Sequence, residues 1–166
     1  MPATYEPIST TTLASGTASV TFSAIPATYT DLVLVIDGLA ASTAFDAWIR
    51  INGDTATNYS NTSLYGSGAA AGSSRNSNLT AGYLETQATY RSTNRTMQIV
   101  HFFNYANTTT YKTWLSQAGS STDYVERIVG LWRKTPEAIT TILISNSGPS
   151  NFGIGSVFTL YGIKAA

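Results

Sequence analysis

Residues 17–23, with the sequence TASVTFS, alternate strictly between small polar and apolar side chains. Apolar residues at every second position share one face of an extended chain, so this stretch predicts a half-buried β-strand. Residues 30–37 follow, with Leu32, Leu34 and Ile36 on one face and Val33 and Val35 on the other. No comparable stretch has the period of a long amphipathic helix, and the chain is therefore predicted to be all-β.

The same pattern recurs along the chain between polar turns. We predict strands over residues 18–22, 30–37, 45–51, 79–84, 95–105, 111–118, 124–133, 139–145 and 156–164. Asn52-Gly53 is typical of a tight hairpin turn, and the small, polar residues 65–78 are predicted to form a flexible loop. Eight to ten short antiparallel strands without a linker indicate one domain, residues 1–166, folded as a β-sandwich of jelly-roll type.

The composition excludes several classes of function. The nine basic residues are balanced by nine acidic ones, so the usual electrostatic basis for binding nucleic acid directly is missing. Charged residues make up 11% of the chain, well below the roughly 25% of an ordinary soluble domain. No apolar run approaches the ~18 residues of a spanning helix, so no membrane partner is expected. Low charge is typical of a protein whose working state is an assembly.

The late strands are apolar on both faces. Ile128 and Trp132 lie opposite Val125, Val129 and Leu131, whereas an isolated sandwich leaves one face of each sheet polar. Either long loops or neighbouring subunits must therefore cover the second face, and large apolar patches favour subunits. The predicted state is a homo-oligomer, with a trimer as the expected form. The candidate interface residues are large aromatic side chains: Trp48, Tyr65, Tyr111, Trp114, Trp132 and Tyr161.

Catalytic chemistry finds little support in the sequence. His101 is the one histidine, on a strand with Met97, Ile99 and Phe103 on the same face, and is interpreted as a hydrogen-bonded histidine near the core. No Gly-x-Ser-x-Gly motif marks a nucleophile. With one histidine and no cysteine, a transition metal lacks its preferred ligands. Asp54 and Asn58 could contribute to a calcium site, but turn chemistry explains them better. We expect no enzyme activity, no cofactor and no metal.

The remaining acidic residues and the tyrosines leave two other readings open. Two of the nine carboxylates could converge into a glycosidase site, although most lie at strand ends or turns. Tyrosines beside Asn and Thr could stack on sugar rings, which predicts a glycan-binding face, while the same residues also suit a core or a protein interface. The tyrosines placed in or beside predicted loops are Tyr59, Tyr65, Tyr83, Tyr90, Tyr105, Tyr111 and Tyr124.

Four segments carry a resemblance to known proteins. They have the sequences PATYEPI (residues 2–8), IPATYTDLVL (25–34), NGDTATNYS (52–60) and GSVFTLYGIKAA (155–166). They resemble small all-β structural proteins of tailed bacteriophages and cyanophages, and modules of tail-fibre proteins.

The resemblance implies a virion structural protein. The first reading is a capsid decoration or cement protein on the head surface, which stabilises the assembled head by bridging subunits of the major capsid protein. The alternative is a tail-associated module that recognises a host surface glycan. The resemblance includes no catalytic motif, so no functional residues are transferred.

Overall fold

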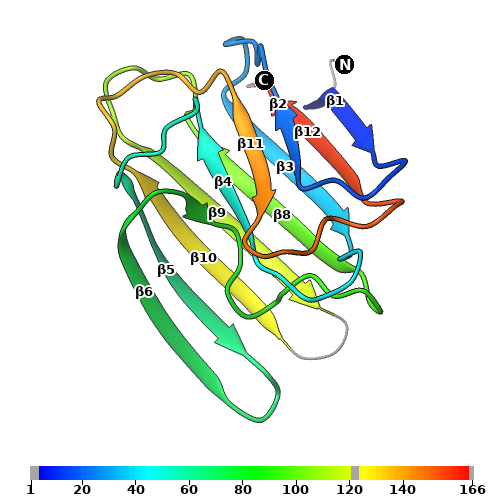
Figure 1. The fold of residues 1–166 in the computed structure, drawn as a ribbon. Coiled ribbons are helices and arrows are strands. Elements are labelled where there is room, and N and C mark those ends of the chain that lie inside the picture. Colours follow the sequence, from blue (N-terminus) through cyan, green and yellow to red (C-terminus); the bar gives the residue numbers. More distant parts are fainter. Residues whose placement is uncertain (1–3, 121–123, 165–166) are drawn as a thin grey trace.

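The computed structural model describes residues 4–120 and 124–164, and this part of the chain is all-β. Its twelve strands form two antiparallel sheets packed face to face (Figure 1). The strands are β1 (Tyr5–Thr12), β2 (Ser19–Phe22), β3 (Asp31–Gly38), β4 (Ala47–Ile51), β5 (Tyr59–Gly66), β6 (Ala71–Leu79), β7 (Gly82–Tyr83), β8 (Thr96–Phe103), β9 (Lys112–Ser120), β10 (Val125–Trp132), β11 (Ile142–Asn146) and β12 (Val157–Ile163). The β-sandwich predicted from the sequence is confirmed.

Eight of the strands form a jelly roll. The pairs β1·β12, β2·β11, β3·β8 and β4·β7 are the four rungs of one long antiparallel hairpin. The hairpin rolls up because β12 also pairs with β3, and β11 with β4. This wrapping sends alternate rungs to different sheets, giving the orders β1-β12-β3-β8 and β2-β11-β4-β7.

Two inserted hairpins enlarge one sheet only. The β9–β10 and β5–β6 hairpins add beyond β8, so the larger sheet has the order β1-β12-β3-β8-β9-β10-β5-β6. In Figure 1 this extension projects well past the four-stranded sheet. The two hairpins therefore widen the larger sheet beyond the four strands that the jelly roll contributes to it.

The strand number differs from the predicted eight to ten because β1, β5 and β6 lack strong apolar alternation. Residues 65–78 are not a flexible loop, since β5 and β6 pair along most of this segment. The hydroxyls of Ser63 and Ser74 hydrogen-bond across the pair at 2.7 Å, and the ring of Tyr65 lies over Gly72. Backbone hydrogen bonds therefore hold these strands together, although their small polar side chains lack the apolar alternation from which strands were predicted.

The Asn52-Gly53 turn forms, but it does not close a hairpin. Both residues have positive φ angles, 50° and 68°, and the Asp54 amide donates to the carbonyl of Ile51 at 3.0 Å. The strand before the turn, β4, pairs with β11 and β7, whereas the next strand, β5, pairs with β10 and β6. The turn therefore carries the chain from the smaller sheet to the larger one.

The core lies between the sheets. Phe45, Tyr90, Phe152 and Phe158 form an aromatic cluster with ring centroids 4.9–5.5 Å apart. A second aromatic group, Tyr59, Trp114 and Trp132, fills the space beneath the inserted hairpins. No helix long and apolar enough to cross a membrane occurs in the described residues.

Candidate interaction surface

The side of the eight-stranded sheet that faces away from the four-stranded sheet is called the outer face. Strand β10 shows the division: Glu126, Ile128, Gly130 and Trp132 are buried, while the side chains between them point outward. Apolar side chains on three strands of this sheet remain accessible there: Leu64 (β5), Met97, Ile99 and Phe103 (β8), and Val125 and Val129 (β10). Leu64 is 63% exposed, Val125 67% and Val129 56%, so the described residues leave this face uncovered.

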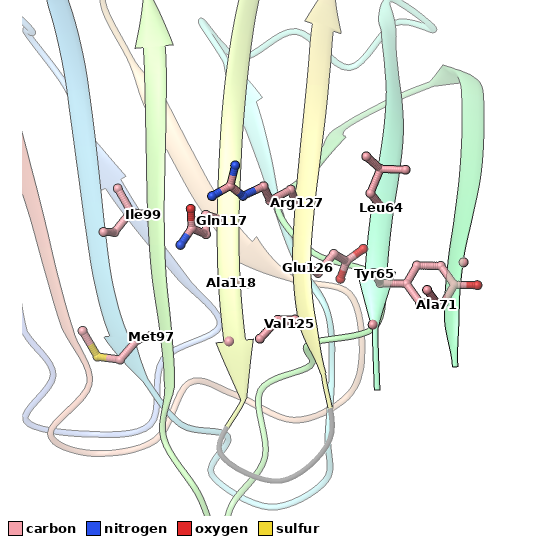
Figure 2. Close-up of a pocket in the computed structure, with 13 residues that line it drawn as sticks. Leu64, Tyr65, Ala71, Met97, Ile99, Gln117, Ala118, Val125, Glu126 and Arg127 are labelled. Carbon is pink, nitrogen blue, oxygen red and sulfur yellow. The ribbon is translucent and has the colours of Figure 1, made fainter. Parts of the chain in front are cut away.

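One end of the outer face is hollowed into a groove of about 680 Å³ (Figure 2). Met97 and Ile99 lie at one side of the groove, Leu64 at the other, and Val125 between them. The hollow exists because glycines separate these side chains. Gly119 lies between Met97 and Val125 in register, and Gly66 lies on the other side of Val125. A Cβ added to Gly119 would have no atom within 4 Å.

Arg127 is the charged residue of the groove whose side chain remains available. No other described residue forms a hydrogen bond or ion pair with its guanidinium, and Gln117 is its direct cross-strand neighbour. Glu126 does not neutralise it, because its carboxylate accepts hydrogen bonds from the amides of Thr86, Gln87 and Ala88 at 2.9, 2.8 and 3.1 Å. The groove is therefore apolar with one cation and one amide in it.

Four of the predicted interface residues are accessible, although they do not form one patch. Tyr65 lies at the groove beside Tyr124, with ring centroids 6.1 Å apart, and Tyr111 is 54% exposed just before β9. Tyr161 is half-buried on the outer face of β12, in edge contact with Tyr5. Trp48 is half-buried on the four-stranded sheet beneath the guanidinium of Arg50, at 5.1 Å.

The prediction is wrong for Trp114 and Trp132. Trp114 is fully buried and Trp132 is 1% exposed, so neither side chain can contact a partner. Both belong to the inner sides of their strands, where the indole N–H of Trp132 donates to Asp54 Oδ2 at 2.6 Å. Leu64 was missed because β5 was not predicted, and no pattern in its Ser- and Asn-rich surroundings marks it as exposed.

The single histidine lies on the outer face rather than near the core. Its Nε2 is 2.9 Å from Asp31 Oδ2, and its ring stacks on Phe103 with centroids 4.3 Å apart. The carboxylate that orients the ring comes from the neighbouring strand β3. The sequence did not reveal this pair, because Asp31 and His101 lie far apart in the chain. Met97, Ile99 and Phe103 share its face, as predicted.

Buried carboxyl groups form the most perturbed electrostatic region. Glu85 is fully buried between the sheets, where it accepts hydrogen bonds from the Ala47 amide and from Gln98 Nε2 at 2.8 Å. Burial raises the pKa of Glu85 well above its usual value and, with the charge of Glu126, raises the pKa of Asp46 to about 6. Glu85 and Glu126 are enclosed, so they offer no surface at which a sugar could be cleaved.

The Asp54 carboxylate is surrounded by donors rather than arranged for a cation. It accepts from Asn58 Nδ2 at 2.8 Å, from the Ala56 amide at 2.9 Å and from the Trp132 indole. Turn chemistry therefore accounts for Asp54 and Asn58. Across residues 4–120 and 124–164, no group of three or more His, Asp or Glu side chains is arranged to hold a metal ion.

Comparisons with known proteins add no functional information. No protein-family profile matches the chain, and no curated protein matches it significantly. One solved structure, a protein of unknown function from Shewanella oneidensis MR-1, aligns over 98% of this chain and 71% of its own length. The identity is 12% and the TM-score 0.29, so this similarity supports no conclusion about function.

Proposed function

We propose that this protein is a virion structural protein, a capsid decoration or cement protein that stabilises an assembled phage head by bridging major capsid subunits. The observation that supports an assembly role is the uncovered outer face, with Leu64, Val125 and Val129 all more than half exposed. Exposed apolar patches of this kind mark protein contacts. The proposed location on a phage head rests on the resemblance of four segments to phage structural proteins.

The mechanism is mass action. A protein that binds the assembled lattice but not its separate subunits stabilises the lattice by RT ln(1 + L/Kd) per site, where L is the free concentration of the binding protein. Half-exposed side chains such as Met97 and Ile99 would contribute about 1 kcal/mol each on complete burial. Because association itself costs at least about 4 kcal/mol, one contact of this kind is weak, and repeated contacts across a lattice strengthen it by avidity.

The location of the protein in virions tests this proposal. Reconstruction of purified particles, or immunogold labelling, should find many copies on the head. Heads that lack the protein should disassemble at lower temperature and recover when it is added back. Detection of the protein at the tail alone, or its absence from particles, would overturn the proposal.

The alternative function is a tail module that recognises host glycan, and the structure supports it less. Tyr59, Tyr90 and Tyr105, three of the seven tyrosines on which it depended, are buried in the core. The observation that still favours it is the Tyr65–Tyr124 pair beside the groove. It predicts binding of the purified protein to host polysaccharide, which the variants Tyr65→Ala and Tyr111→Ala should weaken. Binding that both variants retain would exclude the tyrosine-based site.

A further inference from the structure

The outer face has an ordered pattern across four neighbouring strands, β8, β9, β10 and β5. The cross-strand register aligns their outward residues in rows. The row at the groove is Met97, Gly119, Val125 and Gly66. Large side chains therefore alternate with glycines along the row. Met97 is 51% exposed, Val125 is 67% exposed, and the next residue in the row after each is a glycine.

The next two rows continue the surface away from the groove. The second row is Ile99, Gln117, Arg127 and Leu64, and the third row is His101, Leu115, Val129 and Thr62. If two copies face each other, each row can lie opposite the same row of the other copy in reverse order. Residues in the first two rows then face residues that complement them. In the first row each large side chain meets a glycine, and in the second row Arg127 meets Gln117 while Ile99 meets Leu64.

We propose that the outer face binds a second copy of this chain, face to face, about a two-fold axis that runs parallel to the strands between β9 and β10, which gives a dimer in place of the trimer expected from the sequence. This inference rests on the proposed function in treating the outer face as an assembly contact, and it names a second copy of the chain, rather than the capsid protein, as the partner at this face. The axis places β10 of one copy over β9 of the other, and β8 over β5. Val125 of each copy then fills the gap at Gly119 of the other, and Met97 fills the gap at Gly66.

The electrostatics agree with this pairing. A two-fold interface uses the same surface twice, so a cation near the axis must meet a neutral or acidic group. Arg127 would lie over Gln117, whose amide oxygen can accept from the guanidinium, and Val129 would lie over Leu115. The chain has no net charge, so two copies do not repel each other overall.

The size of the face is sufficient for a specific dimer of moderate affinity. Four strands spaced by about 4.8 Å, each with eight residues rising about 3.4 Å, give about 500 Å² per copy. The total of about 1,000 Å² is near the lower limit for specific interfaces. Two sheets stacked in this way pack about 10 Å apart, as in an ordinary sandwich.

Sedimentation equilibrium of the purified full-length protein, with light scattering as a second measure of mass, tests the proposal. A dimer is expected at concentrations of about 100 μM. Val125→Arg should raise the dissociation constant at least about tenfold, because it puts a cation where the partner has an apolar gap. The matched control is Ile154→Arg, since Ile154 is 68% exposed but lies in the loop before β12.

An exchange of the large and small residues tests the register. Gly119→Val alone should clash with the partner's Val125, and Val125→Gly alone should leave a gap, so each should weaken the dimer about tenfold. The double variant exchanges the two positions in both copies and should restore affinity to within about threefold of the original. Circular dichroism and urea unfolding check that each variant is folded.

A monomer at about 100 μM, a trimer, or a dimer that Val125→Arg leaves unchanged would overturn the proposal. A double variant no better than the two single variants would overturn the stated axis. These outcomes are separate from the proposed function: a monomer found on heads would refute the dimer alone, and a dimer absent from virions would refute the decoration role alone.

Discussion

The indole of Trp114 on β9 occupies the space that a side chain at Gly130 on β10 would need. The two residues are direct cross-strand partners, and a Cβ at position 130 would overlap atoms of the indole ring. Gly82 approaches the same ring, so two glycines border one buried indole. This close packing is what fills the core beneath the inserted hairpins.

Gly130→Ala is expected to destabilise the protein by about 2–3 kcal/mol, because the added methyl group forces Trp114 out of its packed position. Urea unfolding measures the loss. Gly119→Ala is the matched control on the neighbouring strand, where the added methyl group meets open space within the chain. Unfolded at about 1 μM, where the proposed dimer is dissociated, it should leave stability unchanged or raise it by about 0.5–1 kcal/mol. Equal stabilities for the two variants would contradict the packing described here.

Asp54→Asn is expected to cost about 2–3 kcal/mol, because its NH2 group would face either the Ala56 amide, which donates to Oδ1, or the N–H groups of Asn58 and Trp132, which both donate to Oδ2. Burial acts to raise the pKa of Asp54, but these hydrogen bonds outweigh it and lower the pKa below its usual value. The carboxylate therefore stabilises the fold at pH values above the unfolded pKa of 3.8, and this contribution is lost as the pH falls through the folded pKa.

Unfolding measured between about pH 2 and 6 should show a smaller loss of stability at acid pH for Asp54→Asn than for the original protein. Asp37→Asn is a suitable comparison, because Asp37 forms an exposed ion pair with Arg95 and should contribute less than about 1 kcal/mol. If stability fell by the same amount at acid pH in Asp54→Asn and in the original protein, the hydrogen-bonded carboxylate would not be the cause of that loss.

Asp46→Asn is expected to raise stability at pH 7. The folded pKa of about 6 lies roughly 2 units above the unfolded value of 3.8, so the contribution is fully present below pH 3.8 and declines as the pH rises through 6. After allowance for solvent screening, the gain from Asn at pH 7 is about 1–2 kcal/mol. Thermal unfolding from pH 5 to 7 should show a flatter profile for the variant. A profile parallel to that of the original protein would contradict the assignment.

Asn52 connects the end of β4 to the segment before β11, and its replacement should loosen both. Its side-chain oxygen accepts from the amides of Thr140 and Thr141 at 2.9 and 3.0 Å, and its φ of 50° favours Asn or Gly. Asn52→Ala is expected to cost about 2–4 kcal/mol through lost hydrogen bonds and strain.

Asn52→Gly separates these two causes, because glycine accepts the positive φ but lacks the side chain. It should restore about 1 kcal/mol of the stability lost in Asn52→Ala. Urea unfolding of both variants gives the comparison. If the glycine variant were the less stable of the two, backbone strain would not contribute at this position.

The strands of the jelly roll were largely predictable because their side chains alternate. Val20 and Phe22 on β2, or Leu32, Leu34 and Ile36 on β3, reveal their buried face at every second position. Strands β5 and β6 could not be predicted this way, because Ser, Asn and Gly carry little apolar pattern and backbone pairing holds them in the sheet. The sequence showed that β10 is apolar on both faces, but the interface residue predicted on it was Trp132, and Val125, Val129, Leu64 and the groove were not predicted.

The order of residues is enough to establish an all-β chain with strands that are apolar on both faces, since a period of two is visible in it. Which of the two faces is covered follows from the packing of the sheets. Trp114 and Trp132 were predicted to be contacts and are buried, while Val125 and Val129 on the opposite side of β10 stay accessible. The reason is that alternation separates two faces of a strand without identifying the inner one, and that identity depends on which distant strands pack against it.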